Sequence, residues 1–248
     1  MTIDATTLSI TVLLFLGAIL YTSVGHAGSS IYVAIMAFFG LATTTIKPTA
    51  LVLNILVSSF TSFRFIKAKL VDFSLLLPLI VGAIPLAFLG GSIELPSALY
   101  KSIIGVLLVI SGLTFLLRKT GNRHENVAAP HFVVGVLVGA AIGFTAGITG
   151  TGGGIFLSPI ALFLSWSTVK KVSGTAAVFI LCNSISGLLG HLSSVRAVPA
   201  EVFIYAVAVL VGAVIGTQYG ITRLSNQGVK KALGIVLVIA GSKLALGG

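Results

Sequence analysis

Long apolar runs recur throughout this chain, and they favour a fold that is embedded in a membrane. They cover about residues 8–24, 29–41, 49–66, 73–92, 99–117, 131–147, 153–165, 172–192, 200–220 and 229–246. Hydrophobic residues form 56% and charged residues 8% of the 248 positions, and the mean hydropathy is +1.15. These values are far too apolar for a soluble domain of this length. We therefore predict an all-α integral membrane protein of about ten transmembrane segments.

The runs fall into two sets of five that match in order. An offset of 124 residues aligns Gly28 with Gly152 and Lys47 with Lys171, and an offset of 129 aligns five identical residues in the fifth and tenth runs. The polar interval between the two sets reads as an exposed loop. We predict a single membrane domain, residues 1–248, built by duplication. Its parts are a first repeat at about 8–117, a loop at 118–129 and a second repeat at about 131–246.

Two runs, 29–41 and 153–165, are too short for an ordinary span. Each has 13 residues, which form about 20 Å of helix, whereas a full span needs about 20 residues. They are either short crossings or re-entrant hairpins. If all ten runs cross, 11 of the 15 Lys and Arg residues face one side and 4 the other, against 8 and 7 for re-entrant hairpins. Because only the first arrangement gives a positive-inside bias, we predict ten crossings in two inverted halves, with both termini extracytoplasmic and the loop 118–129 cytoplasmic.

Two glycine-rich breaks interrupt the apolar sequence at corresponding places. The first break comprises residues 24–30 (VGHAGSS) and the second break residues 147–154 (GITGTGGG). Consecutive glycines break a helix and leave backbone N–H groups unpaired. Such backbone is tolerated at membrane depth only where it is buried in protein or lines a cavity. We expect short discontinuous helices to begin at the breaks and to direct their positive N-terminal ends at one shared site, which would attract an anion.

The candidate substrate-binding residues lie in the two breaks and on the helices around them. Within the breaks they are Gly28, Ser29, Ser30, Gly150, Thr151, Gly152, Gly153 and Gly154, and within the apolar runs they are Asn54, Ser58 and Asn183. The alternative for the Asn and Ser residues is ordinary helix packing in the membrane. His26, in the first break, can contact the anion when protonated or couple transport to a proton. The alternative is that His26 has a structural role and makes a hydrogen bond within the protein.

The acidic residues indicate the charge of the substrate. All five fall at the ends of runs or in loops, namely Asp4, Asp72, Glu94, Glu125 and Glu201. A cation carrier would usually place a carboxylate within the membrane, so an anion is favoured.

Several other classes of protein find no support in the sequence. The second break lacks the Gly-Lys-Ser/Thr ending of a phosphate-binding loop, and no cluster suggests a metal or a catalytic triad. The single cysteine, Cys182, cannot form a disulfide framework. The formal net charge of +10 comes from basic residues between apolar runs rather than from a nucleic-acid patch. We expect no enzyme activity, cofactor, metal or nucleic acid; the expected partners are an anionic substrate, the lipid bilayer and a second copy in a homodimer.

Residues 147–159 (GITGTGGGIFLSP) resemble the second-half signature of the TauE/SafE sulfite exporter family, and residues 24–28 (VGHAG) resemble its first-half counterpart. The resemblance spans nearly the whole chain through its size, duplication and glycine placement. It implies a bacterial inner-membrane permease, working in import or export, for sulfite, organosulfonates and related sulfur-containing or carboxylate anions. The family's first copy often carries a fuller Gly-Gly pattern where this chain has Ser29 and Ser30.

These observations favour a secondary transporter that moves a small anion by alternating access of the two halves around a midplane site. An anion channel is one alternative, because the same breaks can form a selectivity constriction. A transporter of a carboxylate, or of a cation or metal, is another. Saturable flux with counterflow distinguishes a carrier from a channel, and a carboxylate facing the site would indicate a cation.

Replacing Gly153 by valine tests whether the second break forms the binding site. The added side chain is expected to abolish substrate binding while leaving expression and folding broadly intact. Binding of the anion to the purified variant measures this, and unchanged binding would argue against the site.

Overall fold

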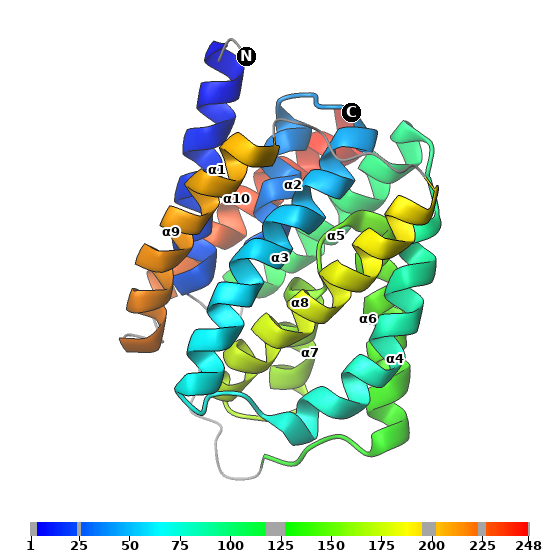
Figure 1. The fold of residues 1–248 in the computed structure, drawn as a ribbon, viewed down its shortest axis with the longest axis vertical. Coiled ribbons are helices and arrows are strands. Elements are labelled where there is room, and N and C mark those ends of the chain that lie inside the picture. The colour runs from blue at the N-terminus through cyan, green and yellow to red at the C-terminus, as the bar shows by residue number, and fades with distance from the viewer. Residues whose placement is uncertain (1–3, 24–25, 118–126, 195–201, 223–226, 248) are drawn as a thin grey trace.

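The chain folds into a bundle of helices in the computed structural model, which describes residues 4–23, 26–117, 127–194, 202–222 and 227–247. Over these ranges there are ten α-helices and no strand (Figure 1). They are α1 (Ala5–Ser23), α2 (Ser29–Phe38), α3 (Thr43–Lys67), α4 (Phe73–Ser92), α5 (Ser97–Leu117), α6 (Phe132–Thr149), α7 (Gly154–Phe163), α8 (Val169–Ser194), α9 (Val202–Thr222) and α10 (Gln227–Gly247). The all-α prediction is confirmed, with one helix for each apolar run. Most of the predicted loop at 118–129 lies outside the described residues.

Most of the helices suit a membrane. Within the described residues seven are long and apolar enough to cross one, namely α1, α3, α4, α5, α6, α8 and α9. Their outward faces carry large apolar side chains, among them Leu137 and Phe203, which are 65% and 79% exposed. A water-soluble protein would bury such residues, whereas lipid receives them. The chain is therefore a multi-pass membrane protein.

The two short helices begin where the glycine breaks end. Gly28 precedes α2 with φ 95°, and Gly153 precedes α7 with φ 83°. Both angles lie in the left-handed region that glycine adopts without steric cost. Each short helix has 10 residues, which is about 15 Å of helix and half of a full span.

Glycines allow two pairs of helices to lie in close contact and run parallel. In Figure 1, α1 and α9 form one flank of the bundle, α4 and α6 the opposite flank, and α3 and α8 lie between them. A Cβ atom added to any of three glycines on α6 would stand within 2.3 Å of a carbonyl oxygen of α4, with Gly139 on Leu79, Gly143 on Ala83 and Gly147 on Ala87. Gly212 and Gly216 of α9 approach the carbonyls of Phe15 and Ile19 on α1 in the same manner. Such spacing of small residues is typical of helix contacts in membranes.

Two other pairs pack antiparallel. On α5 and α10, Gly105 faces Gly241 and Gly112 faces Gly234. On α3 and α8, the side chain of Leu51 lies by Gly187 and that of Phe65 by Gly174. In both pairs the residue numbers rise along one helix as they fall along the other.

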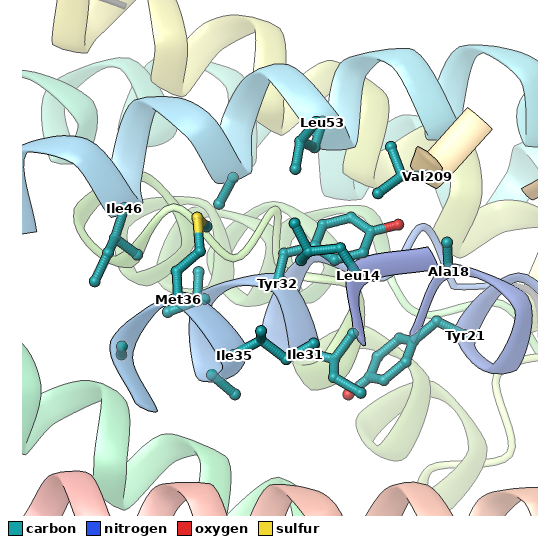
Figure 2. Packing of buried hydrophobic residues seen from close by; sticks show 14 of the residues in the cluster. Leu14, Ala18, Tyr21, Ile31, Tyr32, Ile35, Met36, Ile46, Leu53 and Val209 are labelled. Atoms are coloured by element: carbon teal, nitrogen blue, oxygen red, sulfur yellow. The ribbon is translucent and has the colours of Figure 1, made fainter. Parts of the chain in front are cut away.

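The buried apolar residues form two clusters, and each contains one short helix. Leu157 and Ala161 of α7 lie in a cluster with residues of α4, α6 and α8. Helix α2 lies in the other cluster, where Figure 2 shows its side chains against those of α1, α3 and α9. The labelled residues there are Leu14, Ala18, Tyr21, Ile31, Tyr32, Ile35, Met36, Ile46, Leu53 and Val209. Ile155, in the first turn of α7, also belongs to this second cluster, so the breaks lie where the two clusters join.

Candidate functional site

The two glycine breaks meet inside the bundle. A Cβ atom on Gly154, at the start of α7, would lie 3.4 Å from Cδ2 of His26 in the first break. Ala27 and Ile155 share one buried cluster. The structure thus brings together two segments that are more than a hundred residues apart in sequence.

The second break is a stretch of left-handed backbone between two helices. Gly150 ends α6 with φ 76°, and Gly152 and Gly153 follow with φ 68° and 83°. Two of the break's carbonyl groups find side-chain donors on other helices, since Asn54 Nδ2 donates to the carbonyl of Gly150 at 3.3 Å and the Tyr100 hydroxyl donates to that of Thr149 at 2.9 Å. No side chain caps the N-terminus of α7. The leading N–H groups of α7 are therefore the donors that this segment offers to a ligand.

Three buried side chains surround these N–H groups. Asn183 is 1% exposed, and neither its amide nitrogen nor its amide oxygen has a hydrogen-bond partner among the described residues. The same holds for Ser184 Oγ and Asn54 Oδ1, on residues that are fully buried. Asn183 Nδ2 lies 3.2 Å from the Cβ position of Gly153, and Ser184 Oγ lies 3.0 Å from that of Gly152. Because buried polar groups are almost always paired, this cluster indicates a ligand.

Ser184 was missed by the sequence prediction. Neighbouring residues on a helix point in different directions, so Asn183 and Ser184 would not be expected to share a site. They reach it together because the break wraps past α8 and presents Gly153 to one and Gly152 to the other.

Other predicted hydroxyl groups are already engaged within the protein. Ser30 donates to the Tyr21 hydroxyl at 2.9 Å, and Ser58 donates to the carbonyl of Asn54. Thr149 donates to the carbonyl of Thr145, so in its 2.9 Å contact with Thr151 the latter is the donor. Ser30, Thr149 and Thr151 therefore make contacts within or beside the breaks, whereas Ser58 bonds within its own helix. Nothing is described of the side chain of Ser29, which begins α2.

The first break has a more aromatic environment. The ring of His26 lies edge-on to Tyr21 and Phe115, with centroids 6.3 and 6.0 Å away. A Cβ on Gly28 would stand 2.5 Å from the Tyr32 hydroxyl, so only glycine fits. That hydroxyl is buried and has no partner among the described residues. Figure 2 shows Tyr21 and Tyr32 in the packing between α1 and α2.

The geometry of Gly153 changes the expectation for a valine there. Its Cβ would lie 2.9 Å from Ile142 and 3.0 Å from Phe179, and its positive φ is strained for any other residue. Valine would disturb the packing of α7 as well as the site. Loss of binding in Gly153→Val therefore does not separate recognition from local folding, and a side-chain variant is the better test.

The described helices carry no acidic residue. Asp4 precedes α1, Asp72 caps the start of α4 and Glu94 follows its end, while Glu125 and Glu201 lie outside the described residues. Over the part of the chain that the structure describes, no group of His, Cys, Asp and Glu is placed to hold a metal ion. Within the described residues the surroundings of the breaks thus offer amide, hydroxyl and backbone N–H groups and no carboxylate.

A hollow of about 480 Å³ opens at the C-terminal end of α3. Its lining residues are Phe60, Phe63, Arg64, Lys67 and Ala68. Arg64 lies over the ring of Phe60, 5.7 Å from its centroid, and donates to Gln218 Oε1 on α9. The polar link between α3 and α9 therefore lies beside an open surface.

The chain is similar over nearly its whole length to proteins named as probable membrane transporters. The family described as Sulfite exporter TauE/SafE matches residues 10–244. The probable membrane transporter protein y4hK of Sinorhizobium fredii is 35% identical over 97% of this chain and 99% of its own length. Probable membrane transporter proteins YunE and YjnA of Bacillus subtilis are 22% and 23% identical over 96% and 93% of this chain, and 97% and 96% of their own. No solved structure gives a significant match.

Asn183→Leu separates a ligand role from a structural one. Leucine has a similar volume and removes a buried amide that has no partner among the described residues, so unfolding stability should stay unchanged or rise by about 1 kcal/mol. Substrate affinity should fall at least about tenfold, because a hydrogen bond to a charged ligand is lost. Thermal unfolding in detergent and the KM of anion uptake measure the two effects. Asn54→Leu is the control that should lose stability, since it breaks the bond to Gly150; a destabilised Asn183→Leu with unchanged KM would contradict the assignment.

Proposed function

This chain belongs to the sulfite exporter TauE/SafE family of membrane transporters, and from that premise we propose that it is a secondary transporter of a small anion. The substrate class is sulfite, an organosulfonate or a related sulfur oxyanion. Two inverted repeats, at about 8–117 and 131–246, move it by alternating access within one membrane domain, residues 1–248. The location is a bacterial inner membrane, with both termini outside and the loop 118–129 in the cytoplasm. The partners are the anion, the bilayer and a second copy in a homodimer; no cofactor, metal, nucleic acid or catalysis is part of the proposal.

The observation that carries the anion proposal is the set of donors where the breaks meet. The N-terminus of α7 combines a positive dipole end with N–H groups that no side chain caps. Asn183 and Ser184 add polar atoms with no partner among the described residues, and the described helices contain no carboxylate that would repel an anion. A sulfite or sulfonate group, whose several oxygens all accept hydrogen bonds, suits such a convergent set. The family's description as sulfite exporters supports the same class.

The helix directions support an inverted repeat. Duplication makes α5 equivalent to α10 and α3 equivalent to α8, and both pairs run antiparallel in the structure. A repeat without inversion would make each pair parallel. The glycine contacts are consistent with this repeat. Duplication also makes α4 equivalent to α9 and α6 equivalent to α1, and the pairs α4 with α6 and α9 with α1 are both parallel.

The same directions support ten crossings. If α2 and α7 turned back to the side from which they came, α3 would run the same way as α8, and α5 the same way as α10. Their antiparallel packing favours a chain that changes side at every helix, although α2 and α7 are too short to span alone. This arrangement is also the one in which 11 of 15 basic residues share a side.

Two interfaces that the exchange of halves relates differ in a way that suits alternating access. Helix α4 packs tightly on α8, where a Cβ on Gly91 would stand 2.2 Å from the carbonyl of Gly187. The equivalent pair, α3 and α9, meets through Arg64 and Gln218 beside the hollow. A carrier needs one such interface closed while the other is open, with the roles reversed in its second state.

Uptake into proteoliposomes tests the proposal. The purified protein should take up radiolabelled sulfite with saturation, show counterflow, and be competed by sulfonates more strongly than by divalent cations. An imposed pH gradient tests whether transport is coupled to protons and so whether His26 should be mutated. Empty liposomes are the control.

Each outcome selects a function. Non-saturating flux without counterflow would indicate the channel. Competition by carboxylates alone would move the substrate class away from sulfur oxyanions. Absence of uptake, with no effect of any anion in the panel, would overturn the proposal.

A further inference from the structure

One lysine is buried inside the bundle near the second break. Lys47 of α3 is 5% exposed, although the sequence placed it simply at the start of an apolar run. Its Nζ donates to the carbonyls of Gly91 at 2.7 Å and Ile93 at 2.9 Å, with that of Gly90 at 3.4 Å, at the C-terminal end of α4. Among the described residues no carboxylate forms an ion pair with it. Glu94, just after the end of α4, is the carboxylate whose charge acts on Lys47, without an ion pair between them. The ammonium is therefore a positive charge that is buried and not directly paired.

Lys47 lies next to the second glycine break. A Cβ on Gly150 would lie 3.1 Å from the carbonyl oxygen of Lys47. Asn54 follows seven residues later on α3, about 10 Å along the axis and on the same face. The charge is thus about two helical turns from the polar side chains at the breaks.

A buried histidine lies at the same level on α8. His191 is 2% exposed, and neither ring nitrogen has a hydrogen-bond partner among the described residues. It comes eight residues after Asn183, about 12 Å along the axis and again on the same face. Between them, Gly187 approaches Gly91, whose carbonyl Lys47 caps. Lys47 and Glu94 are the charged groups that act on His191.

We propose that Lys47 and His191 form a second anion-binding site, on the extracytoplasmic side of the breaks, that a small oxyanion occupies on its way between that face and the Asn183 site. This inference rests on the proposed function and its topology. The imidazole supplies an N–H donor that no described residue uses, and the ammonium supplies the charge that offsets the loss of water from the anion. Capping of α4 accounts for the bonds of Lys47 but leaves the two ring nitrogens of His191 without a role.

Sided transport measurements on matched variants test the second site. In right-side-out and inside-out vesicles, His191→Phe and Lys47→Met should raise the KM for sulfite presented at the extracytoplasmic face by about tenfold, the scale of one lost interaction with a charged ligand. The KM at the cytoplasmic face should change much less, and Lys47→Arg should behave as wild type. His131→Phe and Lys171→Met are controls, because both residues are exposed.

The outcomes separate this inference from the proposed function. A folded His191→Phe with wild-type KM at both faces overturns the second site, as does an equal loss at both faces, which a purely structural role would give. Lys47→Met also removes the cap on α4, so His191→Phe decides alone if that variant does not fold. Wild-type vesicles without saturable uptake from either face would overturn the proposed function and this inference with it.

Discussion

Backbone that leaves a helix inside a membrane must find its hydrogen-bond partners within the protein, and the arrangement around the second break follows from that constraint. Two of its carbonyl groups accept from other helices, that of Gly150 from Asn54 of α3 and that of Thr149 from Tyr100 of α5. No side chain caps the N–H groups that begin α7. The N–H groups at the start of α7 therefore remain available beside the unpaired polar atoms of Asn183, Ser184 and Asn54. The anion preference that we propose would then need no charged residue in contact with the ligand.

The charged side chains of the bundle described below lie near the ends of helices. Lysines act where helices end, since Lys47 caps α4 and Lys243 donates to the carbonyl of Phe38 at the end of α2, at 3.1 Å. A cation at a helix C-terminus neutralises the negative end of the dipole, so the positive end of α2 at the first break is less opposed. Acidic residues of the described chain stay outside the helices, as Asp72 does at the start of α4. The helix dipoles and the buried ammonium of Lys47 thus favour the same sign of ligand.

Which parts of this arrangement the sequence could predict depends on how local their causes are. Helix positions follow from apolar runs bounded by glycine and polar residues, and the short helices from glycines that need a left-handed backbone at Gly28 and Gly153, so these were predictable. The state of each hydroxyl was not, because Ser30 bonds to a tyrosine that only the fold brings near. The burial of Lys47 was not predicted for a related reason. The carbonyls that accept its hydrogen bonds lie at the end of α4, more than forty residues away in sequence. The meeting of the two breaks is a property of the helix packing, and the repeat pattern alone could only suggest it.

Locating a bound anion tests the central claim that both breaks build one anion site. Selenite has the shape and charge of sulfite, and selenium gives an anomalous X-ray signal, so crystals grown with it would show where the ion binds. We expect an anomalous peak at the N-terminus of α7, within hydrogen-bonding distance of Asn183, and its loss in Asn183→Leu. A peak elsewhere in the bundle would contradict this claim. If selenite inhibits sulfite uptake by the protein but gives no peak in the crystals, the claim is contradicted as well.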